Sequence, residues 1–180
     1  MSSPNDGLAL ITRHHRHLEE LFDEVFDAED AEQRGWAVQK AADQLAGLMA
    51  AEEQVLYPHI PADDPLRQQA QRQHERMRAL AGELLALAPI EDEVEARCRE
   101  LWEAALDHHR FEDEQLFPHA SRHLSSEQRQ ALATALAVFM VRLHAAGAPR
   151  RALQLRGSAP QSQPQAQVVA LPGSEISRTV

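Results

Sequence analysis

The sequence predicts an all-α protein: an antiparallel four-helix bundle of two repeated helical hairpins, plus a fifth C-terminal helix and a disordered tail. The chain holds 30 alanines and 22 leucines but only 16 valine, isoleucine and threonine residues together. Alanine and leucine favour helices, whereas β-branched residues favour strands. Apolar residues also recur at spacings of three and four, the period of an amphipathic helix. Long helical segments with short connections are typical of an antiparallel bundle.

Most of the predicted helices start at a side chain that can accept hydrogen bonds from the free N–H groups of the first turn. These capping residues are Asn5 or Asp6, Asp30, Asp64 and Ser125. Asp30 with Gln33 resembles a capping box, and Ser125 pairs with Gln128 in the same way. Prolines or a glycine mark the ends of the later helices. The predicted helices span about residues 6–28, 30–57, 65–88, 91–117 and 125–147.

The helical part is predicted to form one domain over residues 5–147, and residues 148–180 a tail. The tail is rich in proline, serine and glutamine and poor in large apolar side chains. Such a segment buries too little apolar surface to offset its chain entropy, so we expect it to be mostly disordered. Its four arginines against one glutamate give too little positive charge to argue for a nucleic-acid partner.

Composition excludes several classes of function. The net charge of −10 disfavours nonspecific binding to nucleic-acid phosphates or anionic lipid. No apolar run approaches the roughly 20 residues that span a bilayer, so we expect neither a nucleic-acid nor a membrane partner. The single Cys98 excludes an internal disulfide framework and a cysteine-cluster zinc site. The N-terminus carries no visible secretory signal, and a cytoplasmic location is expected.

The two halves of the chain resemble each other. The segment EEQVLYPH at residues 52–59 aligns with EDEQLFPH at residues 112–119, an offset of 60. Upstream, HRHLEEL at residues 15–21 aligns with HERMRAL at residues 74–80, an offset of 59. Each half therefore reads as a helical hairpin with a histidine on its first helix and a carboxylate late in its second.

Polar groups fall on the apolar stripe of each of these helices. His15 lies on the stripe of the first helix, Glu53 on the second, His74 on the third, and His109 with Asp113 on the fourth. A buried carboxylate is costly unless it is paired or metal-bound. One buried histidine is usually a hydrogen-bonded core residue, but five such groups at matching depth in two repeats favour a metal site.

The chemistry of this set suits iron. His109 and Asp113 lie one helical turn apart and can reach one metal centre. Imidazole with carboxylate suits iron, manganese or zinc, and two carboxylates from opposite helices would bridge two ions. His108 and Glu112 form a second pair at the same spacing. We rank His108 below His109 as a ligand, because the repeat aligns His109 and Asp113 with Met49 and Glu53 on the apolar stripe of the second helix. Glu52 and Glu112 are expected to orient imidazoles from outside.

These residues resemble the hemerythrin-like, HHE cation-binding family over about residues 8–120. The resemblance rests on HHRHLEEL, EEQVLYP, HERMRAL and HHRFEDEQLFP. It implies a non-haem di-iron centre inside a four-helix bundle, with histidine terminal ligands and two bridging carboxylates. The positions that carry it are His15, Glu53, His74, His109 and Asp113. Members of the family bind or sense dioxygen or nitric oxide, buffer iron, or take part in iron–sulfur repair.

The second helix departs from the family pattern. Where the family has His-x-x-x-Glu, this sequence has Met49 four residues before Glu53. A thioether is a weak ligand for iron, so one position is open, water-filled or taken by another side chain such as Tyr57. A mononuclear centre is the alternative to a di-iron one. Asp113 is shorter than the usual glutamate but keeps its charge.

Three functions stay open. The first is an iron-binding protein that binds or senses dioxygen, nitric oxide or peroxide, or buffers iron. The second is an iron-dependent redox enzyme for peroxide decomposition or iron–sulfur repair. The third is a bundle with a degenerate metal site that acts as an interaction module. The sequence has no phosphate loop or Ser/His/Asp arrangement that would indicate a kinase or a hydrolase. It predicts a small diatomic ligand or peroxide as the binding partner. It does not decide whether the protein is an enzyme or which protein it binds.

Overall fold

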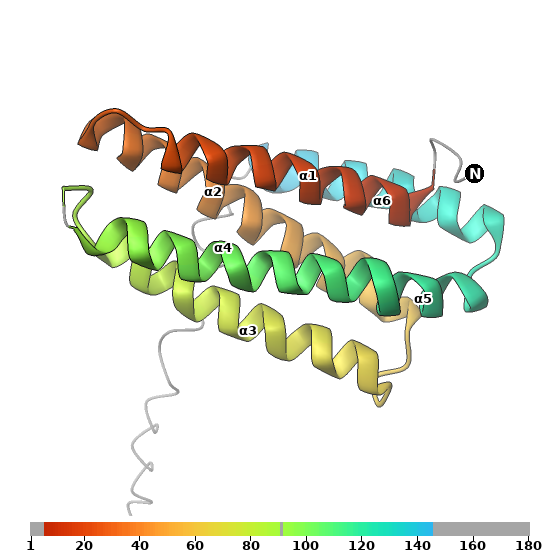
Figure 1. The fold of residues 1–180 in the computed structure, drawn as a ribbon. Coiled ribbons are helices and arrows are strands. Elements are labelled where there is room, and N and C mark those ends of the chain that lie inside the picture. The colour runs from red at the N-terminus through yellow and green to blue at the C-terminus, as the bar shows by residue number, and fades with distance from the viewer. Residues whose placement is uncertain (1–5, 91, 146–180) are drawn as a thin grey trace, which may run out of the picture.

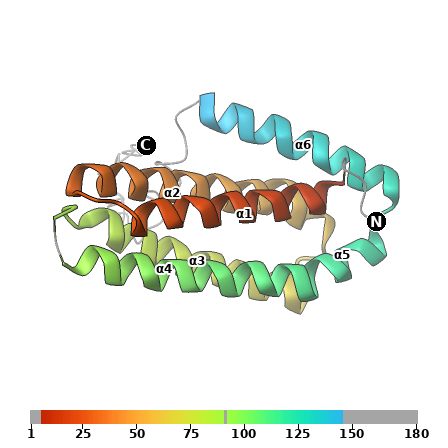
Figure 2. The ribbon, with the colours of Figure 1, turned by 45° about the horizontal axis from the view of Figure 1, so that its top comes forward.

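The computed structural model describes residues 6–90 and 92–145, and the regular structure of these residues is helical. Four long helices run alongside one another in a bundle (Figure 1): α1 (Gly7–Phe26), α2 (Ala31–Ala51), α3 (Pro65–Ala86) and α4 (Glu93–Phe111). The short α5 (Phe117–His123) leads to α6 (Ser126–Ala145), which packs on α1 and α2 (Figure 2). The predicted helical bundle is confirmed. The predicted tail at 148–180 and the domain limits at 5 and 147 lie outside the described residues.

Side-chain caps start α1, α2 and α3 as predicted. The carboxylate of Asp6 accepts from the N–H of Leu8 at 3.0 Å, and that of Asp30 from Gln33 at 2.8 Å. Asp64 accepts from Leu66 at 2.8 Å, with Pro65 in the first turn, where its missing N–H costs nothing. These caps satisfy donors that the helix itself leaves free.

Two helices change their winding just before a proline. After α2 the chain forms the π-helical turn η1 (Glu52–Leu56) and the 3₁₀ turn η2 (Tyr57–His59), and after α4 the π-helical turn η3 (Glu112–Leu116). In η1 the N–H of Tyr57 bonds the carbonyl of Glu52, and in η3 that of Phe117 bonds Glu112. A proline lacks the N–H and crowds the carbonyl one turn earlier, and a wider turn relieves that clash. The helix expected to end at Phe117-Pro118 therefore continues as α5.

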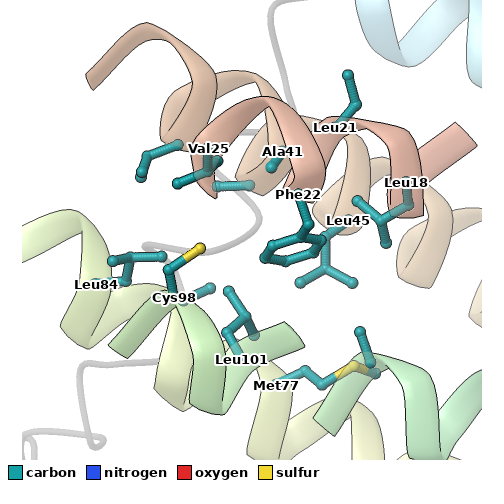
Figure 3. Close-up of a cluster of buried hydrophobic side chains, with 14 of the residues drawn as sticks. Leu18, Leu21, Phe22, Val25, Ala41, Leu45, Met77, Leu84, Cys98 and Leu101 are labelled. Carbon is teal, nitrogen blue, oxygen red and sulfur yellow. The ribbon is translucent and has the colours of Figure 1, made fainter. Parts of the chain in front are cut away.

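The core consists of two apolar clusters with a polar layer between them. One cluster, shown in Figure 3, packs Phe22, Leu45 and Leu101 at the end of the bundle near the α1–α2 and α3–α4 connections. The other contains Ile11 and Leu116 and extends onto α6. Between these clusters lie buried histidine and glutamate side chains: His15, Glu52, His74, His108, His109 and Glu112. The fold therefore places titratable groups in a closed layer between two dry ones.

Helix α6 closes one side of the bundle. Its buried residues are Leu132, Leu136 and Met140. Gly7 makes close packing possible, since a Cβ there would lie 2.7 Å from the Leu132 side chain. Among the described helices, none has the length and apolar content to cross a membrane.

Candidate metal centre

Four side chains converge in the polar layer. Glu52, His74, His108 and Glu112 each offer a ligand atom, and these atoms all lie within 4.8 Å of one another. They are at most 2% exposed and come from η1, α3, α4 and η3. The Nε2 atom of His74 lies 3.1 Å from Glu52 Oε2 and 3.0 Å from His108 Nε2. Imidazole nitrogens and carboxylate oxygens that converge in this way form a typical metal-binding set.

His15 from α1 completes the layer. Its Nε2 atom lies 3.3 Å from Glu52 Oε1 and 3.4 Å from Glu112 Oε2. On the other side, His108 Nε2 lies 3.6 Å from Glu112 Oε1. Each carboxylate therefore directs one oxygen towards His15 and the other towards His74 and His108. We call these five residues (His15, Glu52, His74, His108 and Glu112) the central cluster.

The central cluster has polar atoms that the protein leaves unsatisfied. Glu112 Oε2 and His15 Nδ1 are buried with no hydrogen-bond partner among the described residues. Buried carboxylate oxygens normally accept hydrogen bonds or bind a cation. Because the donor set also contains only nitrogen and oxygen atoms, these residues fit a bound metal ion.

Electrostatics in the cluster couple the histidines to the carboxylates. Burial alone would lower the pKa of His15, but contact with the carboxylates of Glu112 and Glu52 raises it to about 10. For His74, burial also lowers the pKa, but hydrogen bonds with Glu52 and Glu53 outweigh it and raise the pKa to about 9. Burial favours the neutral form of Glu52, yet its three histidine neighbours hold its pKa well below the usual value. Without metal, protons on the histidines neutralise the two carboxylates.

Tyr57 also reaches the cluster. Its hydroxyl donates to Glu112 Oε1 at 3.0 Å and lies 3.2 Å from His74 Nε2. Burial, followed by the charges of Glu112 and Glu52, raises the pKa of this phenol well above its usual value. Tyr57, expected from the sequence as a substitute ligand, thus has its oxygen at that centre.

Of the five sequence-predicted ligands, His15 and His74 lie in the central cluster and Glu53 lies beside it. The Glu53 side chain is 22% exposed and accepts from Arg78 at 2.6 Å. Its Oε1 also lies 2.9 Å from His74 Nδ1, the ring nitrogen directed away from the cluster. On the other side, Gln73 Oε1 lies 3.0 Å from His108 Nδ1. Such outer contacts fix the tautomer and orientation of a ligating imidazole.

His109 and Asp113 lie outside the cluster. His109 is buried and stacks on His15 with ring centroids 3.8 Å apart. Burial, followed by the neighbouring charges of His15 and His108, lowers its pKa to about 2. Asp113 is exposed and accepts a hydrogen bond from Thr12 Oγ1 at 2.9 Å.

At three positions the residue found in the central cluster directly precedes the predicted one. The cluster contains Glu52, His108 and Glu112, whereas the sequence predicted Glu53, His109 and Asp113. Helix geometry explains this shift by one residue. Residues three and four places after a buried residue both lie within about 60° of its direction. Glu52 and Glu53 are therefore equally compatible with the stripe through Met49. The repeat carries the missing signal, since Glu52 aligns with Glu112 as the same residue type whereas Glu53 aligns with Asp113.

The same offset of 60 residues identifies where the halves differ. It aligns His108 with Leu48, which is 2% exposed and packs among apolar residues. It also aligns Tyr57 with Phe117, which has no hydroxyl and stacks on His15 at 6.1 Å. The first hairpin thus lacks one imidazole and supplies a phenol, and the donors are concentrated on the side of His74 and His108.

Comparison with known proteins agrees with this site. A DNA nickase of Nostoc sp. (strain PCC 7120 / SAG 25.82 / UTEX 2576) is 28% identical over 127 residues, which are 69% of this chain and 36% of that protein. The chain thus spans about a third of the length of this curated relative. No solved structure matches the chain significantly. The hemerythrin HHE cation-binding domain matches residues 6–120, which end before α6. Together with a buried cluster of histidines and glutamates, this match shows that the chain belongs to the hemerythrin HHE cation-binding family.

Proposed function

We propose that this protein binds non-haem iron at the central cluster and presents it to a small ligand such as dioxygen, nitric oxide or peroxide. The observation that carries the proposal is the convergence of two buried carboxylates and three imidazoles within one closed layer. The proposed ligands are His15, Glu52, His74, His108 and Glu112, with Tyr57 as a further oxygen donor.

The orientation of the carboxylates supports a centre for two ions. Because Glu52 and Glu112 each direct one oxygen to either side, both can bridge. The two sides are unequal: His74, His108 and Tyr57 lie on one side, and His15 alone on the other. We therefore propose that two ions bind with unequal affinity, with a mononuclear centre as the alternative at low iron supply. Nitrogen and oxygen donors without thiolate suit ferrous and ferric iron.

The burial of the centre supports a small ligand. No side chain of the central cluster is more than 2% exposed. An organic substrate would need an opening of several side chains, whereas a diatomic molecule needs only transient gaps. Bound iron would supply the redox chemistry, and the side on which His15 stands alone has the fewest protein donors. Tyr57, held neutral by burial, keeps a proton beside Glu112.

Pairs of adjacent residues test the ligand assignment. Glu52→Gln, His108→Gln and Glu112→Gln should each lower the iron retained per chain after desalting. Their neighbours Glu53→Gln, His109→Gln and Asp113→Asn are matched controls and should retain more iron than their partners. Elemental analysis together with circular dichroism, to confirm folding, measures this. Equal or greater loss in the control variants would refute the assignment.

The small-ligand part has its own test. Nitric oxide added anaerobically to the ferrous protein should produce a visible absorption band, absent from the iron-free protein. Full iron loading with no spectral response to nitric oxide, dioxygen or peroxide would indicate iron buffering. Peroxide consumption that disappears in Glu52→Gln would instead indicate a redox enzyme.

The relative named as a DNA nickase raises the question of nucleic acid. We propose no nucleic-acid partner, since the net charge of −10 repels phosphates. Conversion of supercoiled plasmid to the open-circular form by the iron- or magnesium-loaded protein would overturn this. A cytoplasmic location is part of the proposal, supported by the lone Cys98, which is buried and unpaired.

A further inference from the structure

Helix α6 covers only part of the face formed by α1 and α2. Near its end, Leu143 contacts Gly47 of α2, with the leucine Cδ2 atom 3.4 Å from the position of a glycine Cβ. Figure 2 shows α6 diverging from α1 and α2 towards its C-terminal end. The uncovered surface beyond it is a groove of about 1080 Å³ that extends to the first turns of α2. His144 of α6 lines the groove, as does Trp36, which is 75% exposed.

The groove is strongly acidic. Five carboxylates line it: Glu20, Asp23, Glu24, Asp27 and Asp43. The only lysine in its lining, Lys40, already pairs with Glu24 at 2.9 Å. Within the described part of the chain, Asp23 and Asp27 make no ion pair. Leu21, Ala37 and the Trp36 ring add apolar surface. A short segment with arginines and a few aliphatic side chains has the chemistry to fill it.

The chain itself carries such a segment directly after α6. Residues 149–156 read PRRALQLR, with three arginines, two leucines and no acidic residue. The next acidic residue is Glu175. We propose that residues 149–156 bind in the groove between α1 and α2, with arginines on the carboxylates and leucines against Trp36.

The geometry of the chain permits this contact. Arg150 lies five positions after Ala145, and an extended chain spans at most about 17 Å over that length. Trp36 and Gln44 on α2 are separated by about 12 Å along the helix axis. A short tether also gives a millimolar effective concentration, so a segment with a dissociation constant of about 0.1 mM is bound about nine times in ten. Weak local affinity is therefore sufficient.

A fluorescence experiment on the full chain tests the proposal. A bimane fluorophore attached to the cysteine of Ser158→Cys reports contact with a tryptophan, because the tryptophan quenches its emission. The natural Cys98 is fully buried, which protects it from labelling. Emission should rise up to about tenfold when Trp36→Phe removes the quencher. The same rise should follow Arg150→Glu with Arg151→Glu. It should also occur in 1 M salt, where the screening length falls to about 3 Å.

Charge reversal in the groove provides the matched comparison. Asp23→Lys with Asp27→Lys should release the segment, whereas Glu103→Lys with Asp107→Lys, the same spacing on α4, should leave bimane quenched. Restored quenching when Asp23→Lys and Asp27→Lys are combined with Arg150→Glu and Arg151→Glu would support direct pairing. Emission unaffected by Trp36→Phe would overturn the proposal. Quenching that disappears on dilution would also overturn it, since the occupant would then be a second copy.

Discussion

Binding of a divalent ion to the central cluster should release two protons at neutral pH. In the metal-free protein the pKa of His15 is about 10 and that of His74 about 9, so both imidazoles are protonated at pH 7. A ligating imidazole must be neutral, so an ion held by His74 and His108 displaces the His74 proton. The charge of that ion on Glu52 and Glu112, the carboxylates that also contact His15, disfavours the His15 proton as well. One divalent ion then replaces two protons without changing the charge of the buried layer. Both pKa values are raised, so proton competition strengthens as the pH falls.

The magnitude follows from these values. His15 lies three units and His74 two units above pH 7, and together they weaken apparent affinity about 10⁵-fold relative to strongly alkaline solution. Between pH 7 and 9, affinity should rise about a hundredfold per pH unit, because two protons are displaced. Between pH 9 and 10, the affinity should rise only about tenfold per pH unit, because a single proton, that of His15, is then displaced.

Calorimetric titration with Co²⁺ in buffers of different ionisation enthalpy measures this directly. The observed enthalpy should vary with a slope of two protons per first ion bound at pH 7. His109→Gln is the control: the pKa of His109 is lowered to about 2, chiefly by burial, so that ring holds no proton to release. His15→Gln should release one proton. Release of fewer than one proton by the unsubstituted protein would refute this account of the buried charges.

Three further changes have expected outcomes. Leu48→His restores the imidazole that the repeat lacks and should raise iron retained per chain, while Met49→His serves as comparison; an unchanged stoichiometry for Leu48→His would mean that it does not face the centre. Phe22→Ala empties a fully buried site and should lower the free energy of unfolding by about 3–5 kcal/mol in urea, with iron stoichiometry preserved. Gly7→Ala forces a Cβ against Leu132 and should cost about 1–3 kcal/mol; an unchanged melting temperature would mean that α6 shifts freely.

The unequal halves of the site give the proposed function its physical basis. The second hairpin contributes both an imidazole and a carboxylate one turn apart, His108 and Glu112. The first contributes Glu52 with the apolar Leu48 at the matching position, and Tyr57 reaches the other side instead. An ion beside His15 would therefore have fewer protein donors and more open positions than its neighbour. We therefore propose that a small ligand would exchange at such a position, and that the ion with more protein donors would be the more tightly held.

The sequence alone determined the bundle, its repeat and the class of site. Alanine and leucine content, capping aspartates and prolines are local signals, and local signals suffice to locate helices. His15 and His74 were also predictable, since each lies in line with apolar residues of its helix: Ile11 and Leu18 for His15, Ala70 and Met77 for His74.

Only the tertiary structure decided which of two adjacent residues enters the polar layer. Glu52 and Glu53 differ by about 100° around one helix, and either can accompany an apolar stripe as wide as the one in α2. The choice depends on how α2 is rotated against α3, and on the wide turn before Pro58 that begins at Glu52. The rotation arises from packing between helices distant in sequence, and such contacts leave no periodic trace along a single helix.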